Sequence, residues 1–179
     1  MLNQNGSVIV VPYNPRWLGI FAQEKEALLR LFAGTLVQIE HIGSTAIPHL
    51  GGEPVIDILL GVLELEQVWK RIPALEELGY RSISESESQN PEQRIFAKEA
   101  DGQHTHHLYV VGIRGEYWRH HLLFRDYLTA HEKMIQQYDE LKVQQAERFK
   151  NDRSAYTEAK SGFIKRVLSE AEQGFCTFC

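Results

Sequence analysis

The sequence predicts a single α/β domain spanning residues 1–179, with a mixed β-sheet, flanking helices and a helical C-terminal half. Three observations lead to this fold class. Strand-like and helical segments alternate as far as Val111, whereas the pattern from Glu116 onward is helical throughout. The segment Val55–Val62 is nearly all apolar, which is typical of a strand buried on both faces. The chain has 179 residues, 43% hydrophobic and 24% charged, as is ordinary for one globular domain.

The first elements follow from capping and turn signals. Val8–Val11 is a short β-branched run that predicts a strand. Asn14 and Pro15 predict a helix start, because asparagine caps a helix and proline fits its first position. Gly34 predicts the end of that helix. Val37–Ile42 then alternates in the manner of a strand.

The middle of the chain predicts an interrupted helix and three further strands after Val55–Val62. A helix over Val68–Leu78 is split or kinked by Pro73, and Tyr80–Ile83 predicts a strand. Residues 84–93 are polar, acidic and without periodicity, which predicts an exposed loop. Two strands joined by a turn at Asp101-Gly102 follow, at Arg94–Lys98 and His106–Val111.

The C-terminal part predicts three helices and a flexible tail at 174–179. The helices run from Glu116 to about His131, from there to about Lys150, and from about Ser154 to Gln173. Cys176 and Cys179 form Cys-x-x-Cys in the tail, which supplies two of the four ligands that a structural zinc site needs. A flexible tail is therefore expected, and an intermolecular disulfide or shared metal is the alternative.

Charge and hydropathy limit the classes of partner. A net charge of −5 argues against a broad nucleic-acid-binding surface. Residues 114–166 nevertheless hold eleven Lys or Arg against eight Asp or Glu, which allows a local basic face for a small anion or a solvated helical surface. No apolar run approaches the ~20 residues of a membrane span, and residues 1–7 lack the pattern of a secretory signal. A cytoplasmic location is expected.

One segment combines a glycine turn with an acidic strand residue. The strand Val37–Ile42 ends at Gly43-Ser44-Thr45, where backbone N–H groups and a hydroxyl suit a phosphate. Asp57 lies in the middle of the apolar strand that follows, where a charge is costly unless it is paired, hydrogen-bonded or bound to metal. The alternative for Asp57 is a structural hydrogen-bond acceptor to the backbone of the turn.

Six ordered motifs are spread along nearly the whole chain. They are Val11–Trp17, Ile39–Pro48, Pro54–Ile58, His106–Leu108, Leu123–Leu128 and Tyr156–Ser161. Together these motifs resemble the GrpB family. This resemblance implies a nucleotidyltransferase-like fold of the polymerase-β type, in which a Gly-Ser turn holds a triphosphate and nearby carboxylates hold a divalent metal. Some relatives are fused to a dephospho-coenzyme A kinase domain, which suggests a link to coenzyme A metabolism.

The resemblance implies that Asp57 and Ser44 are catalytic and that Gly43, Ser44 and Thr45 bind phosphate. Basic residues of later segments are further phosphate candidates, because Arg binds phosphate with two donors and Lys acts as a point charge. Each has a structural alternative in helix packing or an ion pair. These candidates are Arg94, Lys98, Arg125, Lys142 and Lys160.

A divalent metal is the expected cofactor, with Mg²⁺ or Mn²⁺ held by carboxylates, or Zn²⁺ if histidines contribute. Strand alternation places His104 with His106 on one face and His107 with Tyr109 on the other. The alternative is a hairpin with hydrogen-bonded histidines. The candidate metal ligands are Asp57, His41, His107 and Glu40.

Three functions remain open at the sequence level. The first is a nucleotidyltransferase-like protein that binds a nucleotide or another phosphorylated small molecule with a divalent metal. The second is a binding module without transfer, because Val55 and Leu59 occupy the positions of a second carboxylate, two residues either side of Asp57. In relatives, a lysine often occupies the position of Glu53 in this chain, and a histidine often occupies the position of Tyr109. The third is a metal-dependent hydrolase with His and Asp ligands.

Overall fold

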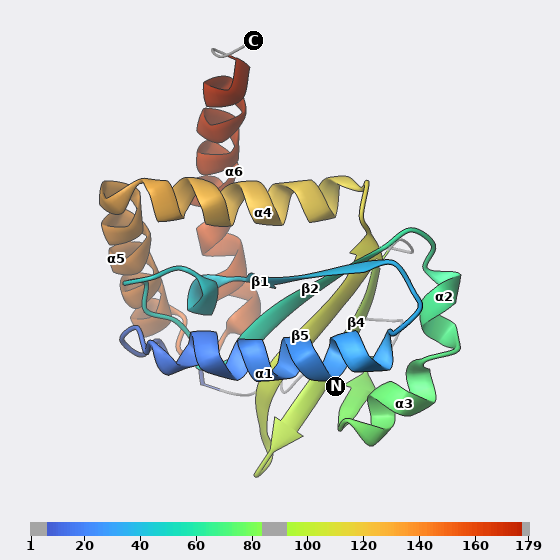
Figure 1. The fold of residues 1–179 in the computed structure, drawn as a ribbon. Helices are drawn as coiled ribbons and strands as arrows, with labels where there is room; N and C mark the ends of the chain where they lie inside the picture. The colour runs from blue at the N-terminus through green and yellow to red at the C-terminus, as the bar shows by residue number, and fades with distance from the viewer. Residues whose placement is uncertain (1–6, 84–92, 177–179) are drawn as a thin grey trace.

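A five-stranded mixed sheet forms the centre of the fold (Figure 1). The structure is a computed structural model and describes residues 7–83 and 93–176. The strand order is β1-β2-β5-β4-β3, in which β2 and β5 pair in parallel and the neighbouring pairs are antiparallel. The strands are β1 (Val37–Ile42), β2 (Ile56–Val62), β3 (Tyr80–Ser82), β4 (Gln93–Ala100) and β5 (Gln103–Gly112).

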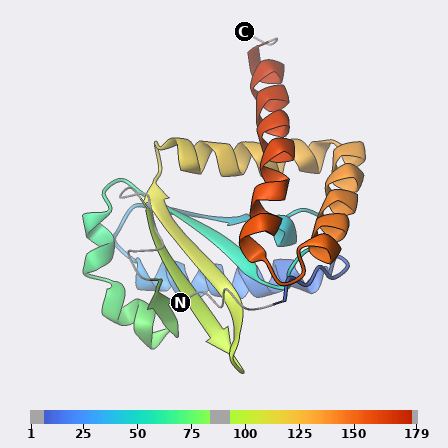
Figure 2. The ribbon, with the colours of Figure 1, turned by 180° about the vertical axis from the view of Figure 1, so that it is seen from behind.

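One face of the sheet packs against the first helix, α1 (Arg16–Leu31). Asn14 caps this helix, since its Oδ1 accepts the Arg16 N–H at 3.0 Å. Side chains alternate between faces along a strand, and the β2 residues that point toward α1 join Trp17 and Leu28 in the main core. Two short helices, α2 (Glu66–Trp69) and α3 (Ile72–Glu77), lie at the β3 side of the sheet (Figures 1 and 2).

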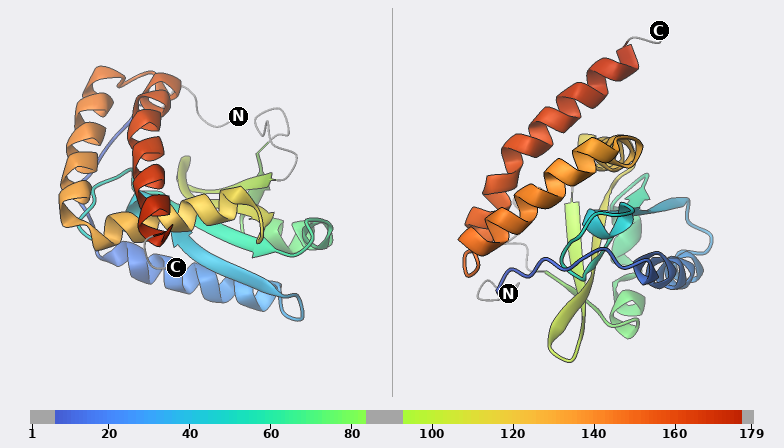
Figure 3. Two further views of the ribbon diagram at one scale, coloured as in Figure 1. Left: turned by 90° about the horizontal axis from the view of Figure 1, so that it is seen from above. Right: turned by 90° about the vertical axis from the view of Figure 1, so that its left-hand side faces the viewer.

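The other face of the sheet meets the C-terminal helices. Trp118 packs directly over Gly61 of β2, where an added Cβ would lie 2.6 Å from the indole ring. Glycine at that position therefore allows the first of these helices to approach the sheet closely. The last of the C-terminal helices crosses the first of them, and the C-terminal end of the last helix extends beyond this crossing (Figure 3). These helices are α4 (Glu116–Ala130), α5 (Glu132–Arg148) and α6 (Arg153–Cys176).

The predicted mixed sheet with a helical C-terminal half is confirmed. The predicted interruption at Pro73 is also confirmed, because Pro73 opens α3 after α2 has ended. The predicted turn between β4 and β5 has positive φ angles of 53° at Asp101 and 74° at Gly102. Such angles favour glycine and tolerate aspartate, which explains the turn residues.

Three expectations change at the ends of elements. Val8–Val11 does not form a strand; only Val11 makes an isolated bridge, to Gly52. Gln93 belongs to β4 and is 7% exposed, whereas the rest of the predicted loop, 84–92, lies outside the described residues. Residues 174–176 continue α6 instead of forming a tail. Residues 177–179, and with them the interpretation of the Cys176–Cys179 pair, lie outside the described part.

Within residues 7–83 and 93–176, no helix has the length and apolar character required to span a bilayer.

Candidate functional site

Asp57 lies against the turn that follows β1. In the sheet it is paired with Ile42, the last residue of β1. The next residue, Gly43, has φ 72° and ψ −172°, a region open essentially to glycine alone. A Cβ added at Gly43 would overlap Oδ2 of Asp57. The Asp57 side chain is 27% exposed, so the carboxylate contacts the turn and is still reachable from solvent.

A row of polar side chains leads away from Asp57. Oδ1 of Asp57 is 3.2 Å from Nδ1 of His107, its neighbour across the β2–β5 pair. The other ring nitrogen, Nε2 of His107, is 3.3 Å from Nδ1 of His104. His104 continues the row, with Nε2 at 3.1 Å from Oε1 of Glu99. Two imidazole rings therefore connect Asp57 to a carboxylate at the end of the hairpin.

The face predicted for His104 is wrong. The β4–β5 register shifts between Lys98 and Glu99, so His106 pairs with Lys98 and His104 pairs with Glu99. An irregularity of this kind inserts one residue and reverses the alternation beyond it. His104 consequently contacts His107, whereas His106 faces Glu24 and Lys98 on the α1 side.

Tyr109 completes the surroundings of Asp57. It lies two residues beyond His107 on β5, and the two rings meet edge to face at 6.1 Å. Burial, followed by the charge of Asp57, raises the pKa of Tyr109 well above its ordinary value. Its hydroxyl therefore stays protonated and donates a hydrogen bond to Asp57.

Lys142 of α5 brings a buried amine to Ser44. Its Nζ lies 3.1 Å from the Ser44 hydroxyl oxygen and also donates to the Gly51 carbonyl. Lys142 is 2% exposed, and burial lowers its pKa to about 7, although the charge of Asp139 acts in the opposite direction. Asp139 in turn accepts the Gly51 N–H at 2.9 Å. Helix α5 thus holds the backbone of Gly51 at both its N–H and its C=O.

Lys160 and Arg153 add cations from α6. The Lys160 Nζ lies 3.9 Å from the centre of the Tyr156 ring, as expected for two residues one helical turn apart. Burial lowers the pKa of Lys160 to about 8, with opposing contributions from Glu53 and Asp57. Arg153 forms an ion pair with Glu53. Helix α5 therefore brings one cationic group into contact with the turn, and α6 adds two more, one paired with Glu53 and one within electrostatic range of Asp57.

His41 and Thr45 do not join Asp57. The His41 ring stacks on Phe21 of α1 with centroids 4.6 Å apart, which places it on the opposite face of the sheet. Its Nε2 lies 3.0 Å from the Thr45 hydroxyl, which itself donates to the Val55 carbonyl at 3.2 Å. Burial lowers the pKa of His41 to about 4, so the ring is neutral near pH 7. His41 and Thr45 therefore help to hold the turn after β1 in place from the α1 side of the sheet.

Arg125 and Glu40 bind each other. Nη1 of Arg125 lies 2.7 Å from Oε2 of Glu40 and 2.9 Å from the His41 carbonyl, and its Nε lies 2.7 Å from Asp126. These bonds join α4 to β1. The interactions engage the Nε and Nη1 donors of Arg125 and an oxygen of Glu40, so the structure gives both residues a role in packing.

Arg94 is not brought to the turn. Its guanidinium lies 4.9 Å from the centre of the Trp69 ring at the end of α2. It pairs with Val110 in the sheet and so lies on the α1 face, together with Lys98. Among the basic candidates, Lys142 and Lys160 are the ones that the structure places beside Ser44 and Asp57.

The positions of the carboxylates and histidines limit the kind of metal site that this protein can form. In the described residues no group of three or more His, Cys, Asp and Glu side chains is arranged to hold a metal ion. His41 lies on the other face and Glu40 binds Arg125. The set therefore does not match a site with three protein ligands, such as a hydrolase with His and Asp ligands would use. Asp57 alone fits Mg²⁺ that takes its remaining ligands from phosphate and water.

Sequence reasoning missed three charged residues: Arg153 and Asp139, which contact the loop after the turn, and Glu99, which ends the row of side chains that leads from Asp57. Arg153 and Asp139 lie in polar stretches of helix, where charged side chains ordinarily face solvent. For Arg153, the sequence signal was the excess of basic residues in 114–166, whereas Lys142 and Lys160 were already among the phosphate candidates.

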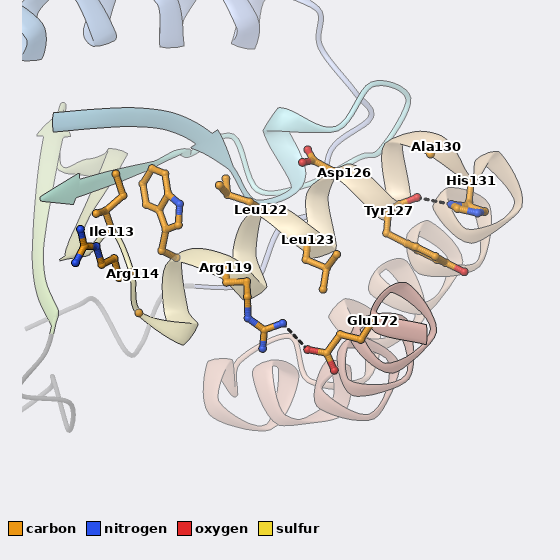
Figure 4. Close-up of a pocket in the computed structure, with 12 residues that line it drawn as sticks. Ile113, Arg114, Arg119, Leu122, Leu123, Asp126, Tyr127, Ala130, His131 and Glu172 are labelled. Carbon is orange, nitrogen blue, oxygen red and sulfur yellow. Dashed lines mark hydrogen bonds and ion pairs between the residues drawn. The ribbon is translucent and has the colours of Figure 1, made fainter. Parts of the chain in front are cut away.

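A separate pocket of about 880 Å³ runs along the outer side of α4 (Figure 4). Its apolar lining includes Trp118, Leu122 and Leu123, and the ion pair of Arg119 with Glu172 lies at the α6 side. None of the residues predicted for the site lines this pocket.

Comparison with known proteins gives consistent matches. The profile of the family described as GrpB protein matches residues 7–170. A glutamate-rich protein GrpB from Alkalihalophilus pseudofirmus is 37% identical over 95% of this chain and 99% of its own length. The UPF0157 protein YqkA of Bacillus subtilis is 32% identical over 93% of this chain and 48% of its own length.

A crystal structure of the conserved protein GrpB from Enterococcus faecalis has the same fold, with a TM-score of 0.84 and 30% identity. The alignment covers 93% of this chain and 99% of that one. The six motifs, the family profile and this structure agree over nearly the whole chain. The protein therefore belongs to the GrpB family.

Proposed function

We propose that this protein is nucleotidyltransferase-like and binds a nucleotide or another phosphorylated small molecule at the Gly43-Ser44 turn, together with a divalent metal. The observation that carries the proposal is the meeting of Asp57, the turn and the buried Lys142 at one place. In that arrangement the ligand's phosphates lie between the cations and the metal that Asp57 holds.

The electrostatics of the cations support an anionic ligand. Lys142 is buried and Lys160 is partly buried, and burial lowers the pKa of each. A buried ammonium is costly unless an anion compensates it. Phosphate oxygens placed near Ser44 supply that compensation, and they also supply ligands for Mg²⁺, which is usually held by one or two carboxylates and substrate phosphates.

The second candidate is a binding module in which transfer has been lost. Its support is the apolar surroundings of Asp57 on β2, where Leu59 on the same face is fully buried in a hydrophobic cluster. Two-metal phosphoryl transfer uses several oxygen ligands, and here Asp57 is the strand carboxylate at the turn. Under this candidate the nucleotide binds and is released unchanged.

Isothermal titration calorimetry tests binding. ATP, GTP and dephospho-coenzyme A are titrated with Mg²⁺, with Mn²⁺ and with a chelator. We expect saturable binding of at least one ligand and an affinity at least about tenfold weaker, about 1.4 kcal/mol, in Lys160→Met. Lys165→Met changes an exposed lysine of the same helix and serves as the control. Absence of binding to all three ligands by the folded wild type contradicts the proposal.

Turnover separates the two candidates. Labelled nucleotide is incubated with the protein and Mg²⁺ or Mn²⁺, and the products are separated by chromatography. Conversion that is lost in Asp57→Asn supports the transferase. Binding in calorimetry without conversion supports the binding module.

A further inference from the structure

The pair formed by Ser44 and Lys142 has a geometry that phosphate binding alone does not require. The hydroxyl oxygen and the amine nitrogen are 3.1 Å apart, within hydrogen-bond distance. Ser44 is only partly buried, whereas Lys142 behind it is 2% exposed. A partly exposed alcohol and a buried amine beside it are the two parts of a serine–lysine nucleophile.

The surroundings of Lys142 favour a neutral amine. Among the described residues, no carboxylate forms an ion pair with Lys142; Asp139, one turn away, binds the Gly51 N–H instead. The Gly51 carbonyl takes one N–H of the amine, and the Tyr138 ring centre lies 5.1 Å from Nζ. Of the other charged groups that act on it, Lys160 of α6 opposes its charge and Glu53 favours it.

A lysine with a pKa near 7 is unprotonated in a substantial fraction of molecules at neutral pH. An ordinary lysine, with a pKa near 10.4, is almost fully protonated there and has no lone pair to accept a proton. Burial therefore converts Lys142 from a fixed charge into a group that can exchange a proton with Ser44.

The position of the hydroxyl is fixed by tight backbone contacts. A Cβ added at Gly52 would lie 2.7 Å from Cβ of Ser44, so the loop presses directly on the serine. The preceding Gly43 holds the turn in a conformation that other residues rarely adopt. Ser44 is thereby held between the loop and Lys142, as a positioned nucleophile requires.

We propose that Ser44 is a nucleophile toward a phosphoryl centre and that Lys142 is its general base. The Ser44 hydroxyl proton passes to the lone pair of the Lys142 amine, a bond forms between Oγ and phosphorus, and the bond from phosphorus to the leaving group breaks. With a nucleoside triphosphate the leaving group is pyrophosphate, and the product is a phosphodiester on Ser44. Only this choice of electrophile rests on the proposed function.

A fluorophosphonate probe tests the pair without any nucleotide. The probe carries an electrophilic phosphorus, and fluoride leaves while Lys142 keeps the proton. We expect intact-mass spectrometry to show one adduct per chain and peptide mapping to place it on Ser44. The adduct is absent in Ser44→Ala, whereas Ser154→Ala, at an exposed serine, is labelled at the wild-type rate.

The role of Lys142 is tested by rates. We expect Lys142→Met to react about 100-fold more slowly, the size of a general-base contribution, and Lys133→Met, at an exposed position of the same helix, to react as wild type. Because the methionine variant risks misfolding, Lys142→Arg provides a second test: it keeps the charge but cannot accept a proton at neutral pH. The wild-type rate itself should rise with pH about a midpoint near 7, the pKa of Lys142.

The outcomes separate this inference from the proposed function. Labelling of Lys142→Arg at the wild-type rate, an adduct on another residue, or a rate independent of pH overturns the Ser44–Lys142 pair. Wild-type protein that binds nucleotide in calorimetry but takes no label overturns the pair alone. Protein that is labelled on Ser44 but binds none of the phosphorylated ligands supports the pair and contradicts the proposed function.

Discussion

Gly43 and Asp57 are in direct contact across the β1–β2 pair, and no side chain larger than hydrogen fits between them. The contact depends on two properties of the chain. Gly43 adopts φ 72°, and Asp57 stands opposite the last residue of β1. Backbone conformation and strand register together bring the carboxylate to the turn.

Alanine at Gly43 is expected to destabilise the fold and to weaken ligand binding. Gly34 provides a matched control, since it also has a positive φ, 80°, but has open space where its Cβ would lie. Gly34→Ala loses stability only through the strained backbone conformation, whereas Gly43→Ala also displaces the Asp57 side chain. We expect urea denaturation to show about 1–3 kcal/mol more destabilisation for Gly43→Ala. If both variants lost the same free energy of unfolding, the overlap of the new Cβ with Asp57 would not contribute to the destabilisation.

Asparagine at Asp57 is expected to remove the metal dependence of nucleotide binding. The substitution keeps the shape of the side chain and can still accept a hydrogen bond from His107, so the fold should persist. We expect calorimetry to show that Mn²⁺ increases affinity about tenfold or more in wild type and has no effect in Asp57→Asn. Asp101→Asn, in the β4–β5 turn, is the control. Retention of the Mn²⁺ effect in Asp57→Asn places the metal elsewhere.

The stability contributed at Lys142 is expected to rise with pH. The folded protein loses the Lys142 proton near pH 7, whereas an unfolded lysine keeps it until about 10.5. Between these values the unfolded state binds more protons, so unfolding becomes harder as the pH increases. The free energy of unfolding of wild type relative to Lys142→Met should therefore increase by up to about 1.4 kcal/mol per pH unit from pH 7 upward. A constant difference from neutral to alkaline pH would contradict the lowered pKa.

Loss of Arg125 is expected to be more costly than loss of Arg119. Both arginines of α4 pair with a carboxylate at 2.7 Å, but the Arg125 side chain is 20% exposed and that of Arg119 is 55% exposed. Arg125→Met also leaves Glu40 and the His41 carbonyl without this donor. We expect thermal denaturation to give about 1–3 kcal/mol of destabilisation for Arg125→Met and less than about 1 kcal/mol for Arg119→Met. Similar destabilisation in the two variants would show that the interactions of Arg125 between α4 and β1 contribute little to the stability of the fold.

The sequence predicted the elements well where local signals are strong. The capping pair Asn14-Pro15, the break at Pro73 and the turn at Asp101-Gly102 each act within a few residues, and the structure has each as expected. The strand predicted at Val8–Val11 was wrong. Its β-branched residues favour a strand, but within residues 7–83 and 93–176 it pairs with no strand and makes only the single bridge to Gly52.

The site was harder to predict because its geometry is not local. The face of His104 depends on an irregularity in the β4–β5 ladder that no residue in the hairpin signals. The separation of His41 from Asp57 depends on the β1–β2 register. The contact of Lys142 with Ser44 joins residues 98 apart in the chain, so it depends on how α5 docks.

The hold of α5 on the backbone of Gly51 has a consequence for dissecting this protein. Asp139 accepts a hydrogen bond from the Gly51 N–H and Lys142 donates one to the Gly51 carbonyl, and the neighbouring Gly52 lies directly against Ser44. A fragment truncated before α5 would keep every residue from Gly43 to Asp57 but would free the loop that fixes the serine. Isolated as a peptide or grafted elsewhere, the segment from Gly43 to Asp57 is therefore expected to lose the fixed position of Ser44, because the contacts that hold it come from a helix distant in the chain.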